Sequence, residues 1–139
     1  MKKKVSIIVL NNFFLDTRVI KLAKTLSKAF NVEVICLHDD EMQNESEKYS
    51  FNIHRLKIKS NRLGKGIFPN LIKYAEFTLQ ALRLIHKSNF IHANDLTALP
   101  IAIFSKIFKR KIVIYDAHEW EIEQGPSSKF KIFILWVIE

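Results

Sequence analysis

The chain of 139 residues has one cysteine, three glycines and three prolines. The single cysteine, Cys36, excludes a disulfide within the chain, fits a reducing cytoplasmic setting, and lies in an apolar run that predicts a small core residue. No apolar run approaches the roughly 18 residues that a membrane-spanning helix needs. The apolar run Val5–Leu10 follows three lysines but is shorter than the roughly 7–15 residues of a signal-peptide core. We therefore interpret the N-terminus as a basic lead-in to a first strand.

The loop predicted over residues 11–15 contains no glycine. No G-x-G-x-x-G fingerprint follows the first strand, which disfavours a dinucleotide-binding Rossmann domain. The histidines and carboxylates lack the spacing of zinc ligands, so the sequence predicts no metal site and no bound cofactor. It also carries no signature of nucleic-acid binding.

The charge is strongly basic, with a formal net value of +8, while 48% of the residues are hydrophobic. This composition predicts one globular domain with a sizeable core. Basic residues concentrate in segments 1–31 and 52–88, whereas segment 32–51 is acidic. An anionic partner, such as a phosphate-bearing substrate or an acidic membrane surface, fits this distribution. A solvated basic face remains the alternative.

Apolar periodicity predicts strands that alternate with helices along the chain. The predicted strands cover residues 4–10, 32–37, 52–57, 90–93 and 111–115. The predicted helices cover 16–29 with Asp16 as cap, 69–87, 97–108 with Thr97 as cap, and 129–138. This pattern is typical of a Rossmann-like α/β fold, a doubly wound parallel sheet of order 3-2-1-4-5 with helices on both faces.

Two of these elements carry more detailed predictions. The strand at 111–115 is apolar enough to be buried on both faces. The helix at 69–87 has an apolar stripe that we expect to face the core, formed by Leu71, Ile72, Ala75, Thr78, Leu79, Leu82 and Ile85. Residues 129–138 are apolar on every side, so we expect the 139 residues to form the front part of a longer protein.

Polar residues follow the predicted strands at their carboxyl ends, where open parallel sheets place their chemistry. These residues are Asn11, Asn12, His38, Asn94, Asp95, Asp116, His118 and Glu119. His118 can donate a hydrogen bond to a sugar hydroxyl or take a proton. A phosphate can meet the helix N-terminus near Thr17 and Arg18. As alternatives, Asp16 and Asp95 are helix caps, and His118 is a loop histidine ordered by Asp116.

Four stretches, taken together and in this order, resemble a known family. They are Asp16–Ala23, Asn31–Ile35, Ile91–Pro100 and Ile114–Glu119. These stretches resemble the first helix, the second strand, the fourth strand with its turn, and the fifth strand with its loop in the N-terminal domain of glycosyltransferase family 4 enzymes of the GT-B fold.

The resemblance implies a retaining transferase that moves a sugar from a UDP- or GDP-linked donor to a glycan or lipid-linked acceptor without a required metal. The N-terminal domain would hold the acceptor, and a missing C-terminal domain would bind the nucleotide, so this fragment alone would be inactive. The histidine that reaches the transferred sugar in the family matches His118. The loop that borders the donor phosphates matches residues 11–15, although the glycine pair of many members is absent here.

We therefore assign His118 as the catalytic residue and Thr17 and Arg18 to the phosphate side. The substrate-binding candidates are Asn11, Asn12, Asn94, Asp95, Asp116 and Glu119. Two alternatives stay open: a nucleotide-sugar 2-epimerase of the same fold, whose cleft would hold one ligand and no acceptor, and a non-catalytic flavodoxin-like binding module.

The family resemblance also implies a place in the cell. Such enzymes often lie on membrane surfaces to reach lipid-linked acceptors, so the expected location is cytoplasmic, with peripheral attachment to the inner face of the cell membrane as an option. A basic segment with two apolar residues among its charges suits an anionic membrane surface. It contains Arg55, Lys57, Lys59, Arg62, Lys65, Lys73, Ile67 and Phe68.

Overall fold

A computed structural model describes residues 2–11, 13–38, 49–64 and 66–116. They form a sheet of five parallel strands in the order β3-β2-β1-β4-β5. The strands are β1 (Lys4–Ile8), β2 (Asn31–Leu37), β3 (Asn52–Leu56), β4 (Phe90–Ala93) and β5 (Ile112–Tyr115). The predicted fold class and strand order are confirmed.

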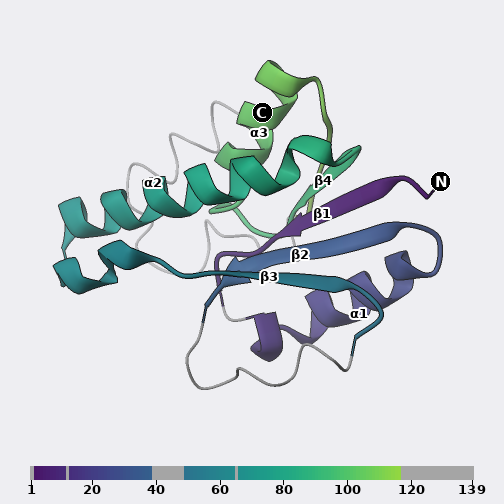
Figure 1. Cartoon of the computed structure of the whole chain (residues 1–139), viewed down its shortest axis with the longest axis horizontal. Helices are drawn as coiled ribbons and strands as arrows, with labels where there is room; N and C mark the ends of the chain where they lie inside the picture. Colours follow the sequence, from purple (N-terminus) through teal and green to yellow (C-terminus); the bar gives the residue numbers. More distant parts are fainter. Residues whose placement is uncertain (1, 12, 39–48, 65, 117–139) are drawn as a thin grey trace, which may run out of the picture.

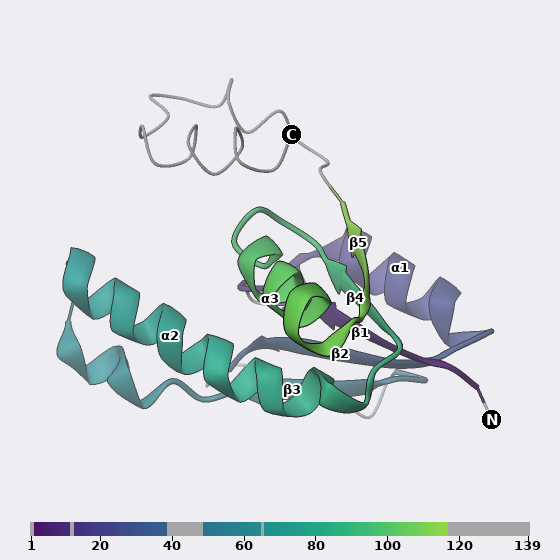
Figure 2. The same cartoon turned by 90° about the horizontal axis from the view of Figure 1, so that it is seen from above.

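The helices lie on both faces of this sheet, with α1 on one face and α2 and α3 on the other (Figures 1 and 2). Their bounds are α1 (Thr17–Ser27), α2 (Ile67–Leu84) and α3 (Leu99–Lys109), and three short 3-10 helices are η1 (Phe13–Leu15), η4 (Lys59–Leu63) and η5 (Ile85–Lys87). The chain leaves β1 toward one edge through α1 and returns past β1 toward the other edge through α2 and α3. Right-handed crossovers in opposite directions place the helices on opposite faces.

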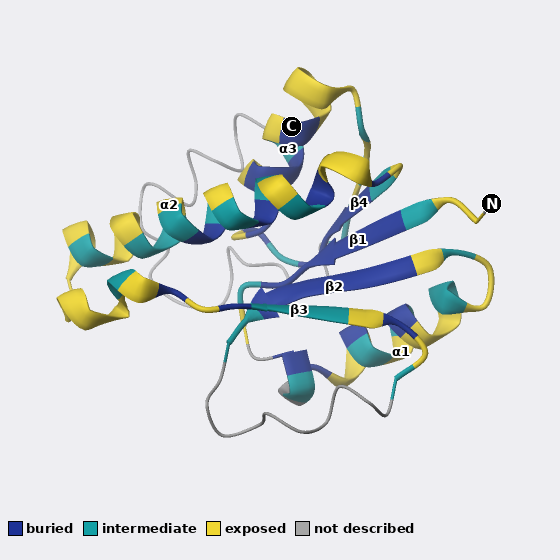
Figure 3. Cartoon of the chain, in the orientation of Figure 1, coloured by how far each residue is buried: buried dark blue, intermediate teal, exposed yellow. Residues whose placement is uncertain are grey.

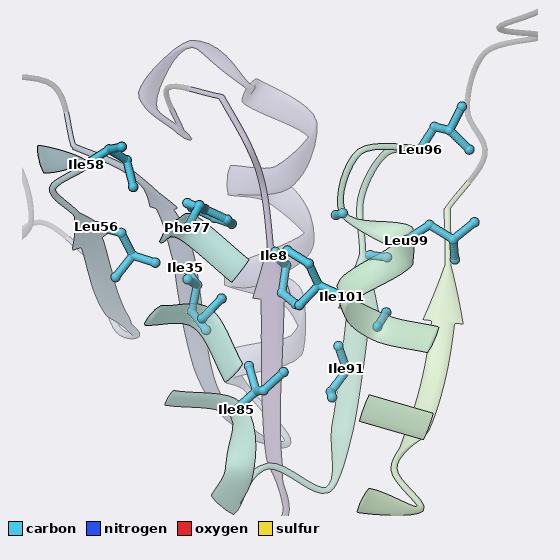
Figure 4. Packing of buried hydrophobic residues seen from close by; sticks show 14 residues of the cluster. Ile8, Ile35, Leu56, Ile58, Phe77, Ile85, Ile91, Leu96, Leu99 and Ile101 are labelled. Carbon is cyan, nitrogen blue, oxygen red and sulfur yellow. The ribbon is translucent and has the colours of Figure 1, made fainter. Parts of the chain in front are cut away.

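Each face of the sheet has its own hydrophobic core, and the central strands are buried on both faces (Figure 3). The core under α1 contains Phe13, Val19 and Ala23 from the helical side. Cys36 belongs to the same core with 1% of its surface exposed, as predicted. The core under α2 and α3 joins Phe77 and Ile85 to residues of the strands (Figure 4).

The side of α2 that meets the sheet overlaps the predicted stripe only in part. The predicted stripe is wrong at Leu71, Ile72 and Leu79, which are 65%, 50% and 60% exposed, and at Ala75, which is also exposed. It is right at Ile85, which is buried, and at Leu82, which packs against the core. Phe77 and Ala81 are buried instead, in line with Ile85 just beyond the helix. Apolar residues cover most of the circumference of α2, so periodicity alone does not select the part that meets the sheet. Among the described residues, no helix is both long and apolar enough to cross a membrane.

The start of α3 also differs from the prediction. Thr97 is not its cap, because the helix begins at Leu99 after Ala98, which has no side-chain capping bond. The Asp95 carboxylate accepts the backbone N–H of Ala98 at 2.9 Å and the hydroxyl of Thr97. Asp95, rather than Thr97, therefore closes the turn that leads into α3. Pro100 still lies in the first turn of the helix, where its missing N–H has no cost.

β5 is an edge strand of the described sheet, and the prediction that it is buried on both faces is wrong. Ile112 and Ile114 are 57% and 47% exposed, whereas Val113 and Tyr115 pack against the core under α2 and α3. The core under α1 reaches Phe90 on the neighbouring strand and no residue of β5. Among the described residues, β5 therefore packs against a core on one of its faces only.

A buried carboxylate lies near the amino ends of the strands, away from the edge where the candidate site residues collect. Glu33 is 3% exposed, and its Oε2 lies 2.8 Å from Lys4 Nζ and 3.1 Å from His54 Nε2. Ser6 and Ser88 donate their hydroxyl groups to Oε1. Both carboxylate oxygens are thus partnered, which is what makes burial of this charge tolerable.

Candidate functional site

The carboxyl ends of the strands meet at one edge, as the candidate site requires. Backbone hydrogen bonds continue the ladder past the strand ends: Asn94 donates to Ile8 at 3.3 Å, and Asp116 donates to Ala93 at 3.0 Å. Asn94 and Asp116 therefore lie side by side, next to the end of β1. The amide of His38 extends β2 in the same way.

The predicted residues at this edge differ in how accessible they are. Asn94 is 2% exposed, Asp116 is half-buried, and Asn11 is exposed. Asn12, His118 and Glu119 lie outside the described residues. The catalytic assignment of His118 and the substrate-binding roles along this edge stay predictions.

The N-terminus of α1 is occupied by its own cap. The Asp16 carboxylate accepts the backbone N–H groups of Arg18 and Val19, both at 3.2 Å, and the Nε of Arg18 lies 3.7 Å from the same oxygen. The capping alternative for Asp16 is thus confirmed. A phosphate at this helix end would compete with that carboxylate for the same amides. The exposed side chains of Thr17 and Arg18 stay predicted contacts on the phosphate side.

A groove opens at the carboxyl ends of β2 and β3, under the N-terminal half of α2. It consists of two adjoining hollows of about 540 and 520 Å³ that share His38, Ile58 and Asn61. We call it the α2 groove. Its apolar floor is formed by Leu10, Leu37, Leu56, Ile58 and Phe77, and its polar wall by His38, Asn61, Asn70, Lys73, Tyr74 and Thr97. The outer hollow adds Lys57, Lys59 and Arg62.

Two hydrogen bonds hold the polar wall of the α2 groove in place. The Tyr74 hydroxyl donates to the carbonyl of Thr97 at 2.9 Å, and Lys73 Nζ donates to the carbonyl of Gly64 at 2.7 Å. Burial raises the pKa of Tyr74. The phenol therefore stays protonated and can accept a hydrogen bond from a ligand through its oxygen.

The chemistry of the α2 groove suits a ligand rich in hydroxyl groups. Asn61 and Asn70 each offer two amide donors and a carbonyl acceptor, and Lys73 offers further donors. An apolar floor with a few polar groups on the wall is the usual composition of a small-molecule site. The lysines and Arg62 at the outer hollow favour a ligand that also carries negative charge.

Sequence reasoning missed most of this groove. It placed Asn61 in a loop and did not single out Asn70 or Tyr74. The signal is a helical spacing: Asn70, Lys73 and Tyr74 are followed by Phe77 at positions that share one face of a helix. That face points to the sheet, so its polar residues line the groove.

No group of three or more histidine, cysteine or acidic side chains that could hold a metal ion occurs within the described ranges. In comparisons with known proteins, no protein-family model matches the chain and no curated protein matches it. The likeness to a family therefore depends on the four stretches of sequence alone.

Proposed function

We propose that this chain is the acceptor-holding N-terminal domain of a retaining glycosyltransferase that uses a UDP- or GDP-linked sugar. The α2 groove is the observation that carries the proposal. It lies at the carboxyl edge of the sheet, and it is lined by Thr97 of the turn after β4, whose hydroxyl donates to Asp95 and whose carbonyl accepts the Tyr74 hydroxyl. A hydroxyl-binding groove thus borders the strand ends that resemble the family.

In this proposal the acceptor binds in the α2 groove of this domain. Asn70, Lys73 and Tyr74 would orient an acceptor sugar, whose apolar ring face would rest on the half-buried Leu10 and Leu37. The donor would approach along the ends of β1, β4 and β5, where Asn94 and Asp116 lie side by side. The donor side needs a second, nucleotide-binding domain, as the resemblance implies.

The catalytic assignments of the proposal follow the family motif. His118 would contact the transferred sugar, with Asn11, Asn12 and Glu119 around it, and Thr17 and Arg18 would face the donor phosphates. Catalysis would come from positioning the two sugars and from closure of the second domain over the cleft. The enzyme would work in the cytoplasm, at the inner face of the cell membrane when its acceptor is lipid-linked.

The test uses the full-length gene product with a panel of UDP- and GDP-sugars and a membrane extract as the source of acceptor. We expect nucleotide release with transfer of the sugar, and loss of both in His118→Ala. Asn70→Ala should raise the KM for acceptor by about fivefold, because a hydrogen bond to a ligand is worth roughly 1 kcal/mol. Its KM for donor should not change. The matched control is Asn52→Ala. Asn52 is exposed and lies at the amino end of β3, away from the groove at the carboxyl end of that strand.

The other outcomes separate the alternatives. Transfer that persists in His118→Ala would keep the transferase but remove the catalytic assignment. An isomerised nucleotide-sugar formed without acceptor would indicate a 2-epimerase. Failure of every donor to react would favour a binding module with the same fold.

A further inference from the structure

The stretch that links β3 to α2 forms the outer wall of the α2 groove and is basic. Lys57, Lys59 and Arg62 line the outer hollow, and all three are exposed. None of the described residues that line either hollow is acidic. Within the described ranges, no ion pair joins these three cations to a carboxylate. The outer hollow therefore presents positive charge to a ligand, and a neutral acceptor sugar would make no use of that charge.

The backbone brings the three cations to one side. The chain is extended at Ile58, with φ −92° and ψ 108°, and the Ile58 side chain is buried in the core. Because side chains alternate along an extended chain, Lys57 and Lys59 both lie on the side opposite Ile58. η4 begins at Lys59, and residues three positions apart in a 3-10 helix share one face, so Arg62 lies in line with Lys59. The spacing thus gathers three positive charges beside one hollow.

Hydrogen bonds from α2 hold this stretch in place, and η4 lies beside the first turns of the helix (Figures 1 and 2). The Glu76 carboxylate accepts the backbone N–H groups of Lys59 and Ser60, both at 2.9 Å, and the Ser60 hydroxyl at 2.7 Å. Gln80 Nε2 donates to the carbonyl of Lys57 at 3.3 Å. A ligand therefore meets cations whose backbone is already ordered, which lowers the entropic cost of binding.

The two hollows of the α2 groove differ in charge. The inner hollow offers the uncharged groups of Asn70 and Tyr74, and its one lysine, Lys73, donates to the carbonyl of Gly64 at 2.7 Å. The outer hollow has three cations among its lining residues. Each hollow, at about 520–540 Å³, has the volume of a small-molecule site, and shared lining residues join them into one groove. A ligand that fills both has a part rich in hydroxyl groups next to an anionic part.

We propose that the acceptor is an acidic glycan whose anionic group, a carboxylate or a phosphate ester, binds Lys57, Lys59 and Arg62 in the outer hollow. The sugar that receives the transferred unit would lie in the inner hollow. A guanidinium group binds two oxygens of a carboxylate or phosphate at once, and lysines add point charges. The donor phosphates fit this place less well, because they are assigned to the start of α1, on the opposite face of the sheet (Figure 2). Only the word acceptor rests on the proposed function.

The experiment measures binding of the labelled full-length gene product to an array of immobilised glycans, with no sugar donor present. The array carries neutral glycans, the same glycans with uronic acids in place of hexoses, and the same glycans with phosphate esters. We expect the neutral glycans to bind at least about tenfold more weakly than one acidic set, because hydrogen bonds between charged groups are the stronger ones. A preference for the uronic acids would assign a carboxylate, and a preference for the esters a phosphate.

Two double variants test whether the three cations recognise the anionic group. Lys59→Gln with Arg62→Gln should weaken binding to the preferred acidic set by at least about tenfold and leave binding to neutral glycans unchanged. The matched control, Arg83→Gln with Lys87→Gln, removes the same charge from exposed positions near the other end of α2. We expect the control to bind like the unmodified protein. Equal losses in both double variants would show a response to net charge alone and would overturn the proposal.

Three further results would overturn it. Neutral and acidic glycans could bind equally well, or no glycan on the array could bind. Alternatively, calorimetry could show that Lys59→Gln with Arg62→Gln loses affinity for UDP or GDP, which would assign the cations to the donor. Because the array contains no donor, a failure of the transferase test leaves its result decisive. Transfer to a neutral acceptor, with no acidic preference on the array, would keep the transferase and remove only the acidic acceptor.

Discussion

Two phenylalanines nine positions apart on α2 should differ in how much their truncation destabilises the fold. Phe77 is 1% exposed and packs in the core with residues of the strands and of α3 (Figure 4). Phe68 lies in the first turn of α2 and is 79% exposed. We predict that Phe77→Ala strongly destabilises the fold and that Phe68→Ala leaves its stability almost unchanged.

The magnitudes follow from burial. Truncation of a buried phenylalanine to alanine costs about 3–5 kcal/mol, as a lost transfer free energy plus a cavity. Only about a fifth of Phe68 is removed from water, which is worth about 0.5 kcal/mol at the usual 1.5–3 kcal/mol for full burial. Alanine has a better helix propensity than phenylalanine by about 0.5 kcal/mol, so the two effects at Phe68 nearly cancel.

Urea denaturation followed by circular dichroism measures both changes, with the m-value checked for constancy. The free energy of unfolding should fall by about 3 kcal/mol or more for Phe77→Ala and change by less than about 0.5 kcal/mol for Phe68→Ala. Comparable losses at the two positions would refute the conclusion that α2 buries only the Phe77 side.

Three further predictions concern single side chains. Glu33→Gln should lower the free energy of unfolding by about 2–4 kcal/mol, because it removes a buried charge paired with Lys4, and urea denaturation would measure this; a change below about 0.5 kcal/mol would contradict it. Burial raises the pKa of Cys36 to about 11, so Ellman's reagent should not react with the native thiol at mildly alkaline pH and should react in urea; reaction at the same rate in both would contradict the burial. Hydrogen bonds, first from the Ser60 side chain and then from backbone N–H groups, hold the pKa of Glu76 below its ordinary 4.5; the stabilisation is thus present above that value and lost as the pH falls through the lowered pKa. The acid decrease in melting temperature should be smaller in Glu76→Gln, and identical profiles would contradict this.

The sheet could be predicted from the sequence because its strands have short apolar runs separated by helical patterns. β1 and β2 are short, mostly apolar runs, as expected for strands buried on both faces. Right-handed crossovers restrict the possible strand orders, and the order expected for two diverging halves, 3-2-1-4-5, is the one observed. The end of each strand is harder to predict than its presence. The strand predicted at 4–10 ends at Ile8, although the amide of Val9 still donates to the carbonyl of Ile35. Apolar character continues past the point where the ladder geometry ends.

The candidate site was only partly predictable, since a capping aspartate and a ligand-binding aspartate look alike in a sequence. Asp16 follows a loop and precedes an apolar periodic stretch, which is the pattern of a cap, and it does cap α1. Asp95 has the same pattern and closes the turn before α3, yet its partner Thr97 also lines the α2 groove, where the Thr97 carbonyl accepts the Tyr74 hydroxyl. Only the spatial neighbour distinguishes the two.

α2 shows why the sequence pattern did not reveal the groove. Apolar residues cover most of its circumference, and the polar residues Asn70, Lys73 and Tyr74 belong to the side that meets the sheet. A stripe chosen by counting apolar residues is therefore centred away from the sheet and meets the core only at Leu82 and Ile85. A core-facing helix does not need its richest apolar side on the core when its first turns extend beyond the sheet. The exposed apolar residues in the first turns of α2 are therefore what moved the predicted stripe away from the side that meets the sheet.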